Sequence, residues 1–267
     1  DSEQIDRMAA LVQRSDGRLR GFVAFDPRRQ NGLQLVREAR EKCNTGVKLY
    51  PPMGYRATGE NEEQHGALWA LYAYCVEHDV PILVHCSPVG FEAGAGLGVK
   101  SSPEHWDAVL TEFPGLRLCY GHAGGDVAEN VDPDTGATVT YPGWLSDPSQ
   151  WADPRNFSRM VAEHCASYEH VYCDFSYLTA IADDDEGRAN FVANLKAALQ
   201  TYDGDYALGD KLMYGSDWHM PSMAAGAGAF LDVLTDIFED PQLHPYKDRF
   251  FHENAARFLK LGVPVNP

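Results

Sequence analysis

The chain has 267 residues, enough for one large α/β domain, and its composition of 44% hydrophobic and 23% charged residues is ordinary for a globular protein. Acidic residues outnumber basic ones by 39 to 22, giving a formal net charge of -17. This negative charge argues against binding to nucleic acid or to anionic membranes, and no apolar run approaches the roughly 20 residues of a membrane span. We therefore expect small molecules as partners.

The cysteines indicate a reducing environment. Six are scattered without a CxxC pair, several within apolar runs: Cys43, Cys75, Cys86, Cys119, Cys165 and Cys173. This pattern favours buried thiols in a cytoplasmic protein over a disulfide framework. No signal peptide is visible, and the chain opens on Asp1 in a helix-like segment, so we expect it to be part of something longer.

Short apolar runs alternate with longer amphipathic segments along the chain, which indicates βαβ units around a parallel sheet. The expected strands are 19–25, 46–50, 81–86, 116–122, 170–175 and 211–215. All are too apolar for a sheet with one face in water. No domain boundary or repeat interrupts this order, so we expect residues 1–267 to form a single domain.

Helices are expected between the strands. Apolar residues recur at helical spacing in 68–77, 191–199 and 230–238. Start signals precede three helices: Asn61 with Gln64, Ser101 with Glu104, and Asp153 with Pro154. The segments that follow strands are long and irregular, and in α/β barrels such loops build the active site. We expect the glycine-rich segment 94–98 to be a flexible lid, since it lacks a phosphate-loop pattern.

Polar side chains stand at or just past the end of each expected strand: Asp26, Lys48, His85, His122, Asp174 with Ser176, and Asp217 with His219. Two imidazoles and a carboxylate from different strands match the ligand preferences of Zn²⁺ and similar ions. Taken singly, each has a structural explanation, such as a hydrogen-bonded histidine or a helix-capping aspartate. Their matched positions favour a site. We expect the remaining histidines at the surface: His65, His78, His105, His164, His244 and His252.

Six segments resemble, in the same order, the amidohydrolase-2 branch of the amidohydrolase superfamily: GVKLYPP, PILVHCSP, FPGLRLCYGHAGG, VYCDFS, KLMYGSDW and ENAARFLKLG. This branch includes the aminocarboxymuconate-semialdehyde decarboxylase-like enzymes. The resemblance covers nearly the whole chain. It implies a TIM-type (β/α)8 barrel with a divalent metal at the carboxyl ends of the strands.

By this resemblance, His85 matches a metal ligand, His122 a histidine that polarises substrate or moves protons, and Asp217 an aspartate that binds metal and acts as a base. Lys48 matches a lysine that is carbamylated when two metals are bound. The family's first strand supplies an HxH pair, and this sequence contains none. Either the first one or two βα units are absent from the chain, a neighbouring segment completes the barrel, or the metal has been lost.

The resemblance implies a metal-dependent hydrolase or decarboxylase that acts on a small carboxylated, cyclic or aromatic substrate through water bound to one divalent ion, with Zn²⁺ expected. The alternative is an inactive, metal-free barrel used as a binding or assembly module. Family members are commonly dimers, so a homodimer is expected by analogy. Among the candidate substrate contacts we favour Arg56, whose guanidinium can bind a carboxylate with two hydrogen bonds. The other candidates are Tyr55, Lys100, Trp144, Tyr177, Trp218 and His219.

Overall fold

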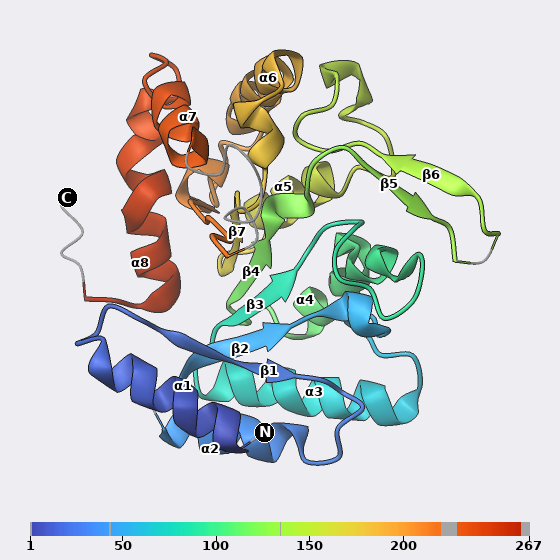
Figure 1. The fold of residues 1–267 in the computed structure, drawn as a ribbon, viewed down its shortest axis with the longest axis vertical. Helices are drawn as coiled ribbons and strands as arrows, with labels where there is room; N and C mark the ends of the chain where they lie inside the picture. Colours follow the sequence, from blue (N-terminus) through green and yellow to red (C-terminus); the bar gives the residue numbers. More distant parts are fainter. Residues whose placement is uncertain (1, 43, 134, 220–228, 263–267) are drawn as a thin grey trace.

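A computed structural model describes residues 2–42, 44–133, 135–219 and 229–262 (Figure 1). Its main feature is a sheet of six parallel strands in the order β1-β2-β3-β4-β7-β8. These strands are β1 (Gly21–Phe25), β2 (Asn44–Leu49), β3 (Ile82–His85), β4 (Leu118–Gly121), β7 (Val171–Asp174) and β8 (Leu212–Met213). All six expected strands are confirmed, and their spatial order follows the chain, as in a (β/α)8 barrel.

Helices precede, connect and follow the strands: α1 (Ser2–Arg14), α2 (Gly32–Glu41), α3 (Glu62–Glu77), α4 (Asp107–Glu112), α5 (Phe157–Ser167), α6 (Asp185–Thr201), α7 (Ala229–Ile237) and α8 (Asn254–Leu259). The expected start of α3 is confirmed, since the Asn61 side chain accepts a hydrogen bond from the Gln64 N–H. The periodic segments 68–77 and 191–199 lie within α3 and α6, and 230–238 corresponds to α7.

The two other expected helix starts are wrong. The Ser101 hydroxyl lies between the carbonyls of Ser87 and Gly98 instead of capping a helix, and α4 begins only after a 3-10 turn at Pro103–Trp106. The helix α5 is capped by Asn156, whereas Asp153 binds the backbone and guanidinium of Arg155. The side chains of Ser101 and Asp153 thus stabilise local turns that end before α4 and α5 begin.

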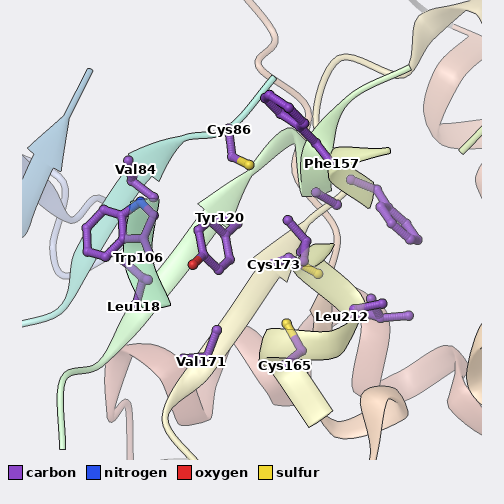
Figure 2. Close-up of a cluster of buried hydrophobic side chains, with 14 of the residues drawn as sticks. Val84, Cys86, Trp106, Leu118, Tyr120, Phe157, Cys165, Val171, Cys173 and Leu212 are labelled. Atoms are coloured by element: carbon purple, nitrogen blue, oxygen red, sulfur yellow. The ribbon is translucent and has the colours of Figure 1, made fainter. Parts of the chain in front are cut away.

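The core fills the space between the sheet and its covering helices. Figure 2 shows part of it, where Trp106 and Tyr120 pack near Cys86, Cys165 and Cys173. The buried cysteine residues of the described chain are unpaired thiols, as expected: Cys75, Cys86, Cys119, Cys165 and Cys173. Cys43 lies outside the described residues. Within the described part, no helix is both long and apolar enough to cross a membrane.

One histidine expected at the surface is buried. His164 on α5 contacts the Tyr120 hydroxyl through Nδ1 and an Asp107 carboxylate oxygen through Nε2, each at 2.8 Å. Its imidazole joins a core tyrosine to a carboxylate at the protein surface.

The long segment after β4 also departs from a simple loop, because β5 (Ala128–Val131) and β6 (Thr138–Tyr141) form an antiparallel hairpin that projects from the body of the molecule (Figure 1).

Candidate active site

Side chains from four neighbouring strands meet at the carboxyl edge of the sheet. We call this group the strand-end cluster: Lys48, Tyr50, His85, Cys119, His122, Asp174 and Ser176. The ring centroids of His85 and His122 lie 4.8 Å apart, and the Tyr50 ring lies 4.5 Å from that of His85. The structure therefore brings together the two histidines that the sequence singled out.

The imidazole of His122 is oriented by Ser176. Its Nδ1 lies 3.1 Å from the Ser176 carbonyl oxygen and 2.9 Å from the Ser176 hydroxyl. Because a carbonyl oxygen can only accept, Nδ1 carries the proton in the neutral ring and Nε2 holds a lone pair. Burial lowers the pKa of His122, with the Asp174 charge acting in the opposite direction, so the ring is largely neutral at neutral pH.

His85 is held by the loop that follows β3. Its Nε2 donates to the Val89 carbonyl oxygen at 2.9 Å, which leaves the lone pair on Nδ1. Burial lowers the pKa of His85 well below its usual range, and nearby positive charge on His122 and Lys48 lowers it further. The loop is also fixed by the Phe91 N–H, which donates to the Tyr50 hydroxyl at 2.9 Å.

Asp174 organises the backbone around His122. Its Oδ1 accepts from the N–H groups of His122 (3.2 Å) and Ser176 (3.1 Å), and its Oδ2 accepts from the Cys119 thiol (3.7 Å). A Cβ added at Gly215 would lie 2.9 Å from both Asp174 Oδ1 and the Ser176 Cβ, so this close approach requires glycine. The sequence placed Asp174 and Ser176 at the strand end but gave them no role in positioning.

Four non-glycine residues at the rim of this site have left-handed backbone conformations. Their φ angles are 67° for His122, 47° for Ala123, 63° for Tyr177 and 46° for Asp217. This region disfavours side chains with a Cβ, and such residues persist where surrounding contacts hold them. Each of them follows a strand of the sheet, so the strain is concentrated where the candidate site lies.

Asp217 lies near the cluster but is exposed, in contrast to the buried strand end that its sequence context indicates. Its charge acts to raise the pKa of both Lys48 and His122, against the effect of burial. Trp218 beyond it is 74% exposed, and its ring packs edge-on against His219 with centroids 6.2 Å apart. Tyr177, 45% exposed, approaches His122 with a centroid separation of 6.5 Å.

Two candidate substrate contacts support the wall behind the site. Tyr55 is buried, and its hydroxyl accepts from the Tyr50 N–H at 2.8 Å and lies 3.3 Å from the Phe25 carbonyl oxygen. Trp144 is also buried, and its Nε1–H donates to the Ala123 carbonyl oxygen at 2.8 Å. Both polar groups bind backbone groups within this wall: that of Tyr55 at Tyr50 and that of Trp144 at Ala123.

The two candidate cations share one carboxylate. Arg56 lies 3.1 Å and Lys100 lies 2.7 Å from the same Glu60 oxygen. The segment containing Gly96 and Gly98, expected to be a flexible lid, is a turn tied through its N–H groups to the Glu92 carboxylate. Tyr50 and Cys119 had not been singled out as site residues. Tyr50 could have been found from alternation, because it stands two residues after Lys48 and therefore on the same face of the strand.

The donors present do not fit a metal ion by themselves. Nowhere in the described ranges do three or more His, Cys, Asp or Glu side chains lie where they could hold one ion. His85, through the Nδ1 lone pair that its Nε2–H bond to the Val89 carbonyl leaves free, and Asp217 would supply two donors. A protein metal site normally uses three or four such ligands.

The comparison with protein families decides the assignment. The family model described as Amidohydrolase matches residues 2–261. The chain belongs to the amidohydrolase family. The expected amidohydrolase-related enzyme and its α/β fold of the TIM-barrel type are confirmed at this level. A comparison with curated protein sequences finds no match.

Solved amidohydrolase structures share the fold at low sequence identity. A probable 2-pyrone-4,6-dicarboxylic acid hydrolase from Acinetobacter baumannii, with citric acid bound, is 13% identical with a TM-score of 0.59, over 95% of this chain and 77% of its own. An amidohydrolase from Burkholderia multivorans with bound zinc is 18% identical with a TM-score of 0.58, over 96% and 79% of the two chains. The second of these two structures therefore holds a metal ion on this fold.

A third structure extends the comparison to decarboxylases. The 5-carboxyvanillate decarboxylase from Novosphingobium aromaticivorans, with manganese and 3-methoxy-4-hydroxy-5-nitrobenzoic acid bound, is 16% identical with a TM-score of 0.55, over 97% of this chain and 70% of its own. Hydrolases and decarboxylases, and zinc and manganese, thus occur on one fold.

Proposed function

We propose that the strand-end cluster is the active site of a hydrolase or decarboxylase that acts on a small carboxylated, cyclic or aromatic substrate. The observation that carries the proposal is the His122 imidazole, fixed through Nδ1 by Ser176 and facing His85. An oriented imidazole with a free Nε2 lone pair is suited to moving a proton. The membership of the chain in the amidohydrolase family supports the same chemistry.

His122 can serve either reaction. In hydrolysis, Nε2 takes a proton from the water that attacks the substrate carbonyl, and the protonated ring then gives that proton to the leaving group. In decarboxylation, Nε2 first takes up a proton from solvent. The bond to the carboxylate carbon then breaks, CO₂ leaves, the bonding electrons stay on the substrate carbon, and the imidazolium gives that carbon its proton and returns to the neutral form. Asp217, at the exposed rim, is the proposed second proton carrier. Tyr177, Trp218 and His219 are proposed as substrate contacts.

We propose that one divalent ion, Zn²⁺, is held through His85 and Asp217 when further donors complete the site. Such an ion polarises a substrate oxygen and acidifies bound water, but the steps above do not depend on it. Elemental analysis after incubation with ZnCl₂ tests this. Bound zinc should be lost in His85→Ala and Asp217→Ala, and zinc retained in both variants would remove these residues from the ligand list.

The test of His122 is catalytic. The assay uses 2-pyrone-4,6-dicarboxylate and 5-carboxyvanillate, the compounds named for two structural neighbours, and follows ring opening and CO₂ release separately. We expect His122→Gln to lower kcat by about 100- to 10,000-fold. His105→Gln, on a half-buried histidine away from the cluster, is the control and should leave kcat unchanged. Equal activity of the two variants would contradict the assignment of His122.

The second candidate function is an inactive, metal-free binding module, which the incomplete donor set within the described residues favours. It predicts ligand binding without turnover, and survival of its function in Asp217→Ala. A protein that converts either compound with dependence on His122 rules it out.

Three further proposals concern the whole protein. The buried free cysteines support a cytoplasmic location, where thiols stay reduced. One continuous core that includes Phe25 and Phe250 supports a single domain over residues 1–267, which a single cooperative unfolding transition would test. Analogy with the family suggests a homodimer, and light scattering after size-exclusion chromatography measures it.

A further inference from the structure

Lys48 is the lysine of the strand-end cluster, and its charge interacts with several other members of it. In the register of the sheet it pairs with Leu83, two residues before His85, so it stands one pleat below the imidazole on the same face. Its charge acts on both His85 and His122, and the carboxylates of Asp174 and Asp217 act on it in turn. Lys48 is thus close to every group assigned a chemical role.

The ammonium of Lys48 has no partner within the part of the chain that the structure describes. It makes no hydrogen bond, ion pair or ring contact there, although the residue is half-buried. The other six lysines each bind a carboxylate or a carbonyl: Lys42 with Asp6 and Glu38, Lys100 with Glu60, Lys196 with Asp240, Lys211 with the Glu169 carbonyl, Lys247 with Glu239, and Lys260 with Asp79. Lys48 is the exception.

A cation in this position is unfavourable without an anion. Removal from water favours the neutral amine, and burial accordingly lowers the pKa of Lys48. The neighbouring carboxylate of Asp174 is already used, since its oxygens accept from two backbone N–H groups and from the Cys119 thiol. A bound anion would supply the missing partner.

Other cations near the loops already have ion-pair partners. Arg56 and Lys100 share Glu60, and the guanidinium of Arg28 binds both oxygens of Asp26. A substrate carboxylate would have to displace an existing ion pair at each of these positions. At Lys48 it would displace none.

We propose that Lys48 is the anchor for a carboxylate of the substrate, with that group bound beside the imidazoles of His85 and His122. The inference rests on the proposed function for the class of substrate, and it assigns the anchoring role to Lys48 in place of Arg56. It further implies that the preferred ligands carry a carboxylate near the reacting carbon, because Lys48 and His122 belong to the same cluster at the strand ends.

Binding of benzene-1,3-dicarboxylate tests the proposal, with its dimethyl ester as an uncharged analogue of similar shape, measured by isothermal titration calorimetry on the full chain. We expect the wild type to bind the diacid and not the ester. Lys48→Met should weaken diacid binding by about tenfold or more, and Lys48→Arg should retain part of the affinity. Arg56→Gln and Lys100→Gln, the matched controls, should stay within about twofold of wild type.

A thermal-unfolding measurement separates anchoring from a structural role. Because Lys48→Met removes a desolvated cation that has no partner, the variant should have an unchanged or higher Tm while its affinity for the diacid falls. Unchanged affinity in Lys48→Met overturns the proposal. So does a wild type that binds neither compound or binds the ester equally well.

The same binding assay distinguishes this inference from the proposed function. His122→Gln should still bind the diacid in preference to the dimethyl ester, because the distinction between a charged and an uncharged ligand depends on Lys48 and needs no proton transfer. Lys48-dependent binding in a protein that turns over no substrate would refute the proposed function and keep the anchor. Turnover that is unaffected by Lys48→Met would refute the anchoring role of Lys48 and keep the proposed function.

Discussion

Gly90 lies where the loop after β3 passes closest to the candidate site. A Cβ added there would lie 2.8 Å from both His85 Nε2 and the Tyr50 hydroxyl. We expect Gly90→Ala to push the loop away from His85, break the bond to the Val89 carbonyl, and lower the free energy of unfolding by about 1–3 kcal/mol. Urea denaturation measures the change.

Gly66 on α3 provides the control for this substitution, because nothing lies within 4 Å of a Cβ added there. We expect Gly66→Ala to stabilise the protein by about 0.5–1 kcal/mol, since alanine favours a helix interior over glycine. If Gly90→Ala were as stable as Gly66→Ala, the contact of the loop with His85 would not constrain the site.

Sequence alone found the histidines of the site but not the groups that orient them. His85 and His122 stand out because an imidazole directly after an apolar strand is uncommon. The orienting contacts come from the Val89 carbonyl and from Ser176, and a backbone carbonyl leaves no trace in residue type. The buried His164 was missed for a related reason, since its partners lie 44 and 57 residues away in sequence.

The N-terminus of α3 is stabilised by two reciprocal hydrogen bonds from backbone N–H groups to side chains. Asn61 Oδ1 accepts from the Gln64 N–H at 3.0 Å, and the Gln64 side chain accepts from the Glu60 N–H at 3.0 Å. We expect Asn61→Ala to cost about 1 kcal/mol of unfolding free energy. Asn31, which precedes α2 without a side-chain capping bond, is the control, and Asn31→Ala should have little effect. Equal costs would show that the bond contributes nothing.

Strands were more predictable than the segments between them. Most positions of the six parallel strands are buried or half-buried, and the strands are correspondingly rich in apolar residues. The hairpin β5–β6 was missed because its strands alternate between exposed and half-buried positions and are rich in polar residues. The helix-start signals at Ser101 and Asp153 were misleading because both side chains make other hydrogen bonds, Ser101 in a tertiary contact and Asp153 in a local turn. The helix α5 therefore starts three residues further on, at Asn156.

At the scale of the whole molecule, buried histidines predict a pH dependence of stability. Burial lowers the pKa of His164 in the folded state below the ordinary value of a histidine, 6.5. The folded form therefore binds a proton more weakly than the unfolded form, so this contribution is fully present above the unfolded pKa and is lost as the pH falls. We expect the free energy of unfolding to decrease from about pH 7.5 to about pH 5, and less steeply in His164→Gln.

Asp126 affects the pH dependence of stability in the opposite direction to His164 and therefore supplies a control. Burial raises the pKa of its carboxyl to about 6, so protonation below that pH favours the folded state. Asp126→Asn should therefore make the loss of stability on acidification steeper than in the wild type. Urea denaturation at a series of pH values measures all three proteins, and identical slopes would exclude both groups as the source of the pH dependence.

The left-handed residues after the strands bear on how this protein could be engineered for heat resistance. Glycine at Ala123 or Tyr177 would relieve a conformational cost of roughly 1–2 kcal/mol per residue, although it would also widen the unfolded ensemble. These positions follow β4 and β7, where Asp174 and Ser176 fix the backbone of His122. Selection for thermal resistance alone would favour such glycine substitutions first. The resulting variants would be more stable to heat but would lose the geometry of the candidate site.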